Sequence, residues 1–334
     1  MGSQKYVVLL LSVLLILNSL LFSGADEDHY YEFILQETEI TKLCSTKTIL
    51  TVNGSFPGPE IRVRRGDTVY VNVHNQGRSA VSFDWQAVED PVDGTNELIQ
   101  PGKNFTYEIE LDDEIGTLWW HARSAWAKAT VHGAFVILPA ADEEYPFPTP
   151  TSDQIIIFGN MVFNSSIYGC NFMVATFCLL YIFKAFESAI AWQIILSGEW
   201  FRQELTEANE TIAAGQADGY TINGHLGETY GCSNDTTFLL EVAYEGLYLL
   251  RLINAVANET MVFAIAQHSF TTVGQNATYA QRSFSTSLTL APGQTIDVLL
   301  GANQNVGQYY ITAQPSSGRH NTTGVLQYLA STGV

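Results

Sequence analysis

The chain has 334 residues, of which 46% are hydrophobic, and a formal net charge of −19 at pH 7. A charge of this sign and size repels phosphate backbones and anionic lipids, so it argues against nucleic-acid partners and anionic membrane surfaces. The length exceeds one ordinary domain and suggests two. The cysteines are too few for a small disulfide-stapled scaffold and lack the close spacing of a zinc or iron–sulfur site. They are Cys44, Cys170, Cys178 and Cys232, and sequence alone allows three pairings among them.

The N-terminal residues 1–25 have the pattern of a secretory signal peptide: Lys5, a long leucine- and valine-rich run, and small residues at Ser23 and Ala25. A membrane anchor has a similar apolar core. The exit into the polar "DEDHYY" favours cleavage, so we expect a mature chain that begins near Asp26 and carries no membrane attachment. Eight Asn-x-Ser/Thr sequons then predict a secreted glycoprotein; they lie at Asn53, Asn104, Asn164, Asn209, Asn234, Asn258, Asn276 and Asn321.

Short alternating segments broken by Gly, Pro and Asn predict strands along both halves of the chain. In the first half they cover residues 68–75, 105–111 and 117–122. In the second half they cover residues 237–243, 248–255, 295–302 and 308–314. Strands at this spacing, with no helical pattern between them, predict an all-β fold of antiparallel sandwiches.

The two halves also repeat each other in order. "TVNGSFPG" is answered by "TINGHLGE", "GDTVYVNVHN" by "EGLYLLRLIN", and "IQPGKNFTYEIEL" by "LAPGQTIDVLLGA". Such ordered similarity indicates a duplicated domain. We therefore predict a first β-domain at residues 26–140, an acidic, proline-rich linker at 141–153, and a second β-domain at 196–334.

Residues 154–195 interrupt this repeat. Their apolar core, residues 172–183, is about twelve residues long, whereas a membrane-spanning helix needs about 20. We therefore expect an apolar insertion or a short buried helix here, rather than a membrane anchor. Its large side chains have no obvious place in the repeated fold and should pack poorly; they are Phe172, Phe177, Leu180 and Phe183.

At this point the motifs resemble a known family. "ILTVNGSFPGPEIRVRRGDTVYVNV", "IQPGKNFTYEIE" and "GTLWWHARSAWAKATVHGAFVILP" resemble the first domain of plant laccases, which are secreted multicopper oxidases. "ADGYTINGHLGETYGCS", "LLRLINAVANETMVFAIAQHSFTTV" and "LAPGQTIDVLL" resemble their second domain. The resemblance implies plastocyanin-like (cupredoxin-like) Greek-key sandwiches, an extracellular (apoplastic) location, copper as cofactor, and lignin-related oxidation of phenolic substrates with reduction of dioxygen to water.

The resemblance also implies what should be missing. Laccases place the copper-binding cysteine and most copper-binding histidines in a third domain, and this chain ends where the second domain would end, so we expect that domain to be absent. The resemblance further implies a disulfide between Cys44 and Cys232 that ties the two domains. Glu97 stands where the family has the first-domain cysteine of a second bridge.

Only one of the four copper ligands of the first domain is retained. The family's H-W-H-G aligns with "SFDWQAV", which puts Asp84 and Gln86 at histidine positions. The family's W-W-H-A-H aligns with "WWHAR", which keeps His121 and puts Arg123 at the other position. A guanidinium is always protonated and repels metal cations, so this pattern indicates the remains of a metal site without stoichiometric copper.

Alternation along a strand predicts how these residues lie. Side chains two residues apart share a face, so Asp84 and Gln86 should meet His121 and Arg123 while the intervening Trp85 and Ala122 face away. Because an unpaired charge would be costly there, we predict that Asp84 and Arg123 form a salt bridge or share a polar cluster, with Gln86 and His121 alongside. The remaining histidines, including His132 and His268, lack metal-pair spacing and are expected to be structural or surface residues.

Three functional hypotheses follow. The first is a secreted, truncated laccase-like glycoprotein without redox turnover, which the ligand pattern favours. The second is an active laccase-type (benzenediol:oxygen) oxidoreductase, as the resemblance suggests. The third is an unproductive product of a damaged gene, in which residues 154–195 are translated intron. The sequence indicates no protein partner.

Overall fold

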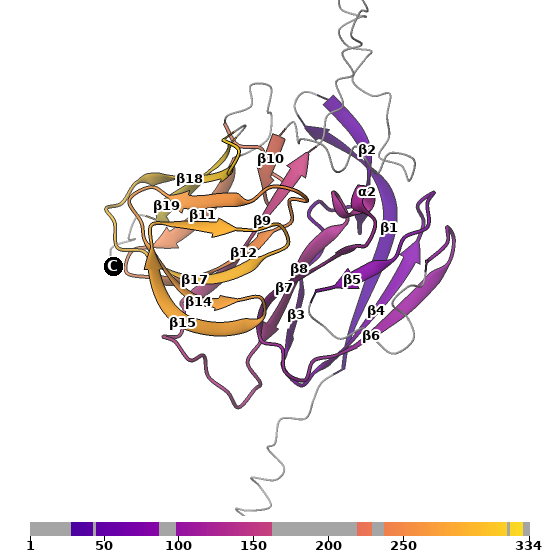
Figure 1. Cartoon of the computed structure of the whole chain (residues 1–334), viewed down its shortest axis with the longest axis horizontal. Coiled ribbons are helices and arrows are strands. Elements are labelled where there is room, and N and C mark those ends of the chain that lie inside the picture. The colour runs from indigo at the N-terminus through magenta and orange to yellow at the C-terminus, as the bar shows by residue number, and fades with distance from the viewer. Residues whose placement is uncertain are drawn as a thin grey trace, which may run out of the picture.

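The computed structural model describes residues 28–42, 45–86, 98–161, 219–228, 237–318 and 321–329. Several predictions lie outside these residues: the signal peptide, the Cys44–Cys232 disulfide, Glu97, most of the apolar insertion, and the sequons at Asn164, Asn209 and Asn234. The described part is all-β apart from one short helix, α2 (Ala125–Lys128), which confirms the predicted fold class. Its strands form two sandwiches that lie side by side (Figure 1).

The first sandwich consists of two four-stranded sheets with the orders β2-β1-β4-β6 and β3-β8-β7-β5. Their core is formed by alternate side chains such as Phe33, Val71, Tyr107 and Trp120. The strands are β1 (Asp28–Lys42), β2 (Ser45–Val52), β3 (Ile61–Arg64), β4 (Thr68–Asn75), β5 (Phe83–Trp85), β6 (Asn104–Glu110), β7 (Gly116–Ala122) and β8 (His132–Leu138).

The second sandwich pairs a six-stranded sheet, β10-β9-β12-β17-β14-β15, with a five-stranded sheet, β11-β19-β18-β13-β16. Its core includes Phe158, Leu250, Phe263 and Val298. The strands are β9 (Ser152–Met161), β10 (Gly219–Ile222), β11 (Phe238–Ala243), β12 (Leu247–Asn254), β13 (Met261–Ile265), β14 (Phe270–Gln275), β15 (Thr278–Ser285), β16 (Ser287–Leu290), β17 (Thr295–Gly301), β18 (Gln308–Pro315) and β19 (Thr322–Leu329).

The two copies of the Asn-Gly motif make the same hydrogen bonds. Asn53 and Asn223 both have positive φ angles, 54° and 49°. Each side-chain oxygen accepts from a backbone N–H of the neighbouring strand, from Ile34 at 2.8 Å and from Ile157 at 2.7 Å. The side-chain nitrogen of Asn53 donates to the Glu32 carbonyl at 2.9 Å, and that of Asn223 donates to the Ile155 carbonyl at 2.8 Å. The repeated sequence thus builds the same capped turn twice.

Strand β9 includes the first residues of the segment expected to be an insertion. It pairs with β12 in parallel and with β10 antiparallel, and Ile156 and Phe158 contribute to the second core. The predicted start of the insertion at Gln154 therefore falls inside a regular strand of the second sandwich.

Strand β7 lies at the boundary between the sandwiches and is buried on both faces. Leu118, Trp120 and Ala122 face the first core. On the other face, Trp119 packs in a separate cluster with residues of both sandwiches, namely Ala134, Val136, Ile157, Ile253 and Ala255. Contacts of β7 with β12, β14 and β17 complete this boundary, so residues on the second face of β7 lie between the two domains.

Candidate functional site

Three of the four residues at the positions where the resemblance implies copper ligands meet at strands β5 and β7: Asp84, His121 and Arg123. These strands pair antiparallel, and Asp84 lies directly opposite His121. Asp84 Oδ1 lies 3.3 Å from Arg123 Nη2, and Asp84 Oδ2 lies 3.3 Å from His121 Nε2. The predicted Asp84–Arg123 salt bridge is confirmed. Trp85 and Ala122 are buried in the first core, as the alternation predicted.

Gln86 does not share these contacts. Its side-chain nitrogen donates to the backbone oxygen of Gly293 at 2.7 Å, across the domain boundary. Its side-chain oxygen is buried and has no hydrogen-bond partner in the described structure. Gln86 was expected to lie alongside Asp84. Instead, its side chain, just beyond the end of β5, hydrogen-bonds the second domain.

Burial favours the neutral form of the His121 imidazole. Its side chain is 9% exposed, and burial lowers its pKa to about 4, assisted by the charge of Lys128. The Ala122 carbonyl and Asp84 oppose this shift without reversing it. Nδ1 lies 2.9 Å from the Ala122 oxygen, the shorter of the ring's two contacts with acceptors, so a proton on Nδ1 makes the better hydrogen bond.

Lys128 is a second basic side chain near this cluster. Its Nζ lies 4.6 Å from the centre of the Trp119 ring, a cation–π distance. Burial lowers the pKa of Lys128, while Asp84 opposes that shift. The Asp84 carboxylate therefore pairs with Arg123 and also acts on the charge of Lys128.

These residues do not fit the copper site that the resemblance implies. Copper at such a position requires several neutral imidazoles, and only His121 supplies one. The Arg123 guanidinium is paired with Asp84 and cannot lose its proton to become a ligand. Within the residues that the structure describes, no three His, Cys, Asp or Glu side chains gather in a way that could hold a metal ion.

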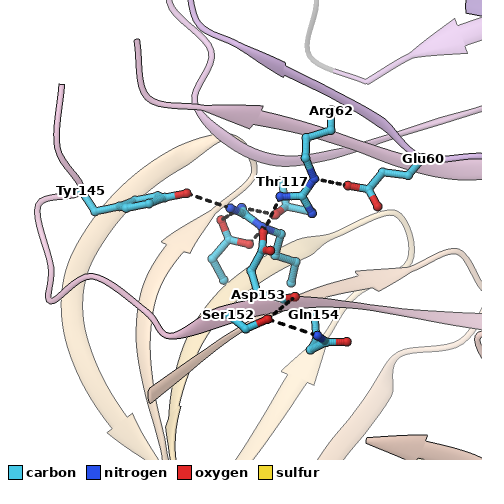
Figure 2. A network of polar contacts seen from close by, with 9 residues as sticks. Glu60, Arg62, Thr117, Tyr145, Ser152, Asp153 and Gln154 are labelled. Carbon is cyan, nitrogen blue, oxygen red and sulfur yellow. Dashed lines mark hydrogen bonds and ion pairs between the residues drawn. The ribbon is translucent and has the colours of Figure 1, made fainter. Parts of the chain in front are cut away.

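A second polar network lies at the domain boundary and was not predicted (Figure 2). Arg251 of β12 is fully buried. Its Nε donates to Asp153 Oδ2 at 2.8 Å, and its Nη1 lies 3.6 Å from Asp297 Oδ2. Nη1 also donates to Thr117 Oγ1 on β7 at 3.1 Å, and Nη2 donates to the Tyr145 hydroxyl at 3.3 Å. The sequence signal for this network is the lone arginine in the apolar "LYLLRLIN".

The carboxylates of this network respond differently to their surroundings. Burial raises the pKa of Asp297, although Arg251 and a 2.5 Å hydrogen bond from Thr117 act against the shift. Burial alone would raise the pKa of Asp153 too, but hydrogen bonds from Arg62 and Arg251 bring it below its ordinary value. Asp153 is thus the carboxylate whose ionised form is well stabilised. The ionised form of Asp297 is stabilised mainly by Arg251.

Two other described histidines form hydrogen bonds with the protein. His132 is fully buried, and its Nδ1 lies 2.8 Å from the Lys128 carbonyl. His268 hydrogen-bonds the Ala266 carbonyl and the Tyr328 hydroxyl.

Among the described residues there is no helix that is long and apolar enough to cross a bilayer.

Comparison with known proteins gives consistent results. Two family models described as multicopper oxidase match residues 34–142 and 193–331. Laccase-12 and Laccase-14 of Arabidopsis thaliana are 34% and 35% identical to the chain, over 91% and 92% of its length. Putative laccase-9 of Oryza sativa subsp. japonica is 37% identical over 87% of the chain. The chain spans about half the length of these relatives, at 50%, 51% and 46%.

Solved structures agree on the fold. The chain is similar to Fet3p, a multicopper oxidase that functions in iron import, with a TM-score of 0.67 and 17% identity over 92% of this chain and 54% of that one. It is also similar to a blue copper oxidase from Nitrosomonas europaea, with a TM-score of 0.65 and 19% identity over 91% and 86% of the two chains. These likenesses confirm the cupredoxin-like fold. The two family models together match more than half of the chain and place it in the multicopper oxidase family.

Proposed function

We propose that this chain is a secreted, laccase-like glycoprotein whose first-domain metal position no longer supports copper-dependent oxidation of phenols. The observation that carries the proposal is the ion pair between Asp84 and Arg123, at 3.3 Å, where the family has imidazoles. A copper ion placed beside His121 would face a fixed positive charge on Arg123. The carboxylate that could attract the metal is already engaged by that charge.

The Asp84–Arg123 pair changes the metal-binding chemistry of this position and has little effect on the stability of the fold. The Asp84 and Arg123 side chains are 39% and 37% exposed, so solvent screens their attraction and the pair contributes about 0–1 kcal/mol. Its main effect is to hold two opposite charges together beside a buried histidine. We therefore assign the pair a structural role.

Secretion and glycosylation rest on the signal-peptide pattern and the sequons. Exposure of the asparagine is needed for a mature glycan, and Asn53, Asn104, Asn258 and Asn276 are all exposed. Phenolic ligands and an apoplastic location come to this chain by analogy with the relatives named laccase. The alternatives, an active laccase-type oxidoreductase and a product of a damaged gene, are outcomes of the tests below.

The test is metal analysis of the purified full chain, secreted from a eukaryotic host supplied with copper, together with phenol-dependent oxygen uptake. We expect copper well below one ion per chain and no oxygen uptake above that of the buffer. Stoichiometric copper that is lost in His121→Ala, with turnover of a phenol, would support the active oxidase instead. A transcript in which residues 154–195 are removed in most copies would support the damaged gene.

Two variants make the comparison sharper. Asp84→His, Gln86→His and Arg123→His together rebuild the four imidazoles of the first domain, and this triple variant should bind more copper than the wild type. Arg123→His alone should bind no more, because Asp84 and Gln86 still occupy two ligand positions. Equal copper in all three proteins would contradict the role given to these residues.

A further inference from the structure

The duplicated turn motif contains one difference that concerns the domain boundary. In the first copy, the Thr51 hydroxyl donates to the Gln36 carbonyl at 3.1 Å and lies 2.7 Å from the Thr38 hydroxyl. In the second copy, the equivalent Thr221 is 1% exposed, and its hydroxyl has no hydrogen-bond partner in the described structure. A buried hydroxyl without a partner is rare in native proteins, so Thr221 requires an explanation.

A second buried polar atom without a partner comes from the first domain. His132 is fully buried, and its Nδ1 is engaged with the Lys128 carbonyl at 2.8 Å. This places the proton of the neutral ring on Nδ1 and leaves Nε2 as a hydrogen-bond acceptor. Nε2 has no partner among the described residues. Burial also lowers the pKa of His132 to about 4, which keeps the ring neutral near pH 7.

Glycine at position 159 brings these two atoms to the same place. Gly159 pairs with Thr221 in the sheet, at the register position that Gln36 has opposite Thr51. A Cβ on Gly159 would lie 2.8 Å from Thr221 Oγ1 and 4.0 Å from His132 Nε2. The Phe56 ring atom Cζ lies 3.7 Å from the same point. Thr221 and His132 therefore face one small space, which has no side chain from Gly159.

We propose that this space is a binding site for one ordered water molecule that joins the two domains. The Thr221 hydroxyl donates to the water, and the water donates to His132 Nε2. The chain of donors continues from His132 Nδ1 to the Lys128 carbonyl, so each group has a partner of the right kind. Buried waters typically satisfy two to four otherwise unpaired polar groups in this way.

Thr221→Val tests the proposal by the sign of its effect. Valine keeps the shape of threonine and removes the hydroxyl. If the water is present, the variant loses a hydrogen bond and its thermal unfolding midpoint should fall by about 2–4 °C. If no water is present, the variant removes an unsatisfied buried hydroxyl, and the midpoint should stay the same or rise.

Thr51→Val is the matched control because it makes the same change at the equivalent position of the first copy. Its hydroxyl bonds protein atoms directly, so its midpoint should fall whether or not the boundary water exists. A fall in both variants supports the water. A fall in Thr51→Val with no change or a rise in Thr221→Val overturns it.

A direct readout uses the unmodified full chain and does not depend on any variant folding. A crystal structure that resolves water should show one within hydrogen-bond distance of both Thr221 Oγ1 and His132 Nε2. Long-range 15N NMR should show His132 protonated on Nδ1, with Nε2 accepting a hydrogen bond. A direct Thr221–His132 hydrogen bond, or a proton on Nε2, would overturn the proposal.

Discussion

Arg251→Met should be among the most destabilising single changes in the described part of the chain. Arg251 is fully buried and is the cation closest to Asp297, which is itself 2% exposed. Removal of one partner of such a buried pair leaves an uncompensated charge and typically costs about 3–5 kcal/mol. Asp153 suffers less, because it keeps the hydrogen bond from Arg62 at 2.7 Å. The expected cost therefore comes mainly from Asp297.

Urea denaturation of the full chain, followed by tryptophan fluorescence, would measure this loss as a fall in the free energy of unfolding. Asp297→Asn in the Arg251→Met background should recover much of it, because the buried negative charge is then removed together with its partner. Arg62→Met is the matched control. Its side chain is 35% exposed, so the same substitution there should cost only about 0–1 kcal/mol.

The pH dependence gives an independent check. Burial raises the folded-state pKa of Asp297, and the loss of Arg251 raises it further. An acid whose folded pKa lies above its unfolded value destabilises the fold when ionised, and the penalty disappears as the pH falls through the folded pKa. The difference in free energy of unfolding between wild type and Arg251→Met should therefore narrow as the pH falls from 7 toward the ordinary Asp pKa of about 3.9. Equal costs for Arg251→Met and Arg62→Met, or a gap independent of pH, would refute this reasoning.

Three further changes test other parts of the structure. Asn223→Ala should cost about 1–2 kcal/mol more than Asn223→Gly in urea denaturation, because alanine resists the φ of 49°; equal costs would count against backbone strain. Trp119→Ala should cost about 3–5 kcal/mol by leaving a cavity between the domains, against a small effect for the 74% exposed Tyr30→Ala. Asp153→Asn should destabilise at pH 7, and its effect should fade below about pH 3.9, because a lowered folded pKa stabilises only while the group is ionised; a constant difference would argue against the ion pair.

Sequence patterns predicted the strands that alternate clearly, such as β4 and β18, and the ordered repeat to which the Asn-Gly motifs belong. They did not predict β1, although Phe33 and Leu35 alternate there with polar residues and fill the first core. Part of the reason is that β1 pairs with β4 in parallel and with β2 antiparallel, a mixed arrangement that no local pattern specifies. β9 was missed for a different reason, since its apolar residues adjoin a longer apolar stretch and were assigned to it.

The candidate site was predictable where geometry within a strand pair decides it. Alternation placed Asp84 on the same side as Arg123, and charge complementarity then required a pair, which the structure contains. Gln86 and Arg251 were not predictable in this way. Their partners, Gly293 and Asp297, come from the other domain, so their contacts depend on how the two sandwiches pack.

The arrangement of β7 explains how copper ligands can be replaced while the sandwich persists. On the face toward the second domain, Thr117 joins the Arg251 network and Trp119 fills the interdomain cluster, both fully or almost fully buried. Arg123 lies just beyond the end of this strand, and its side chain is 37% exposed. The buried contacts of Thr117 and Trp119 therefore lie within the strand, and Arg123 lies beyond its end. Substitution at Arg123 therefore changes the charge beside His121 but removes neither of these two buried contacts.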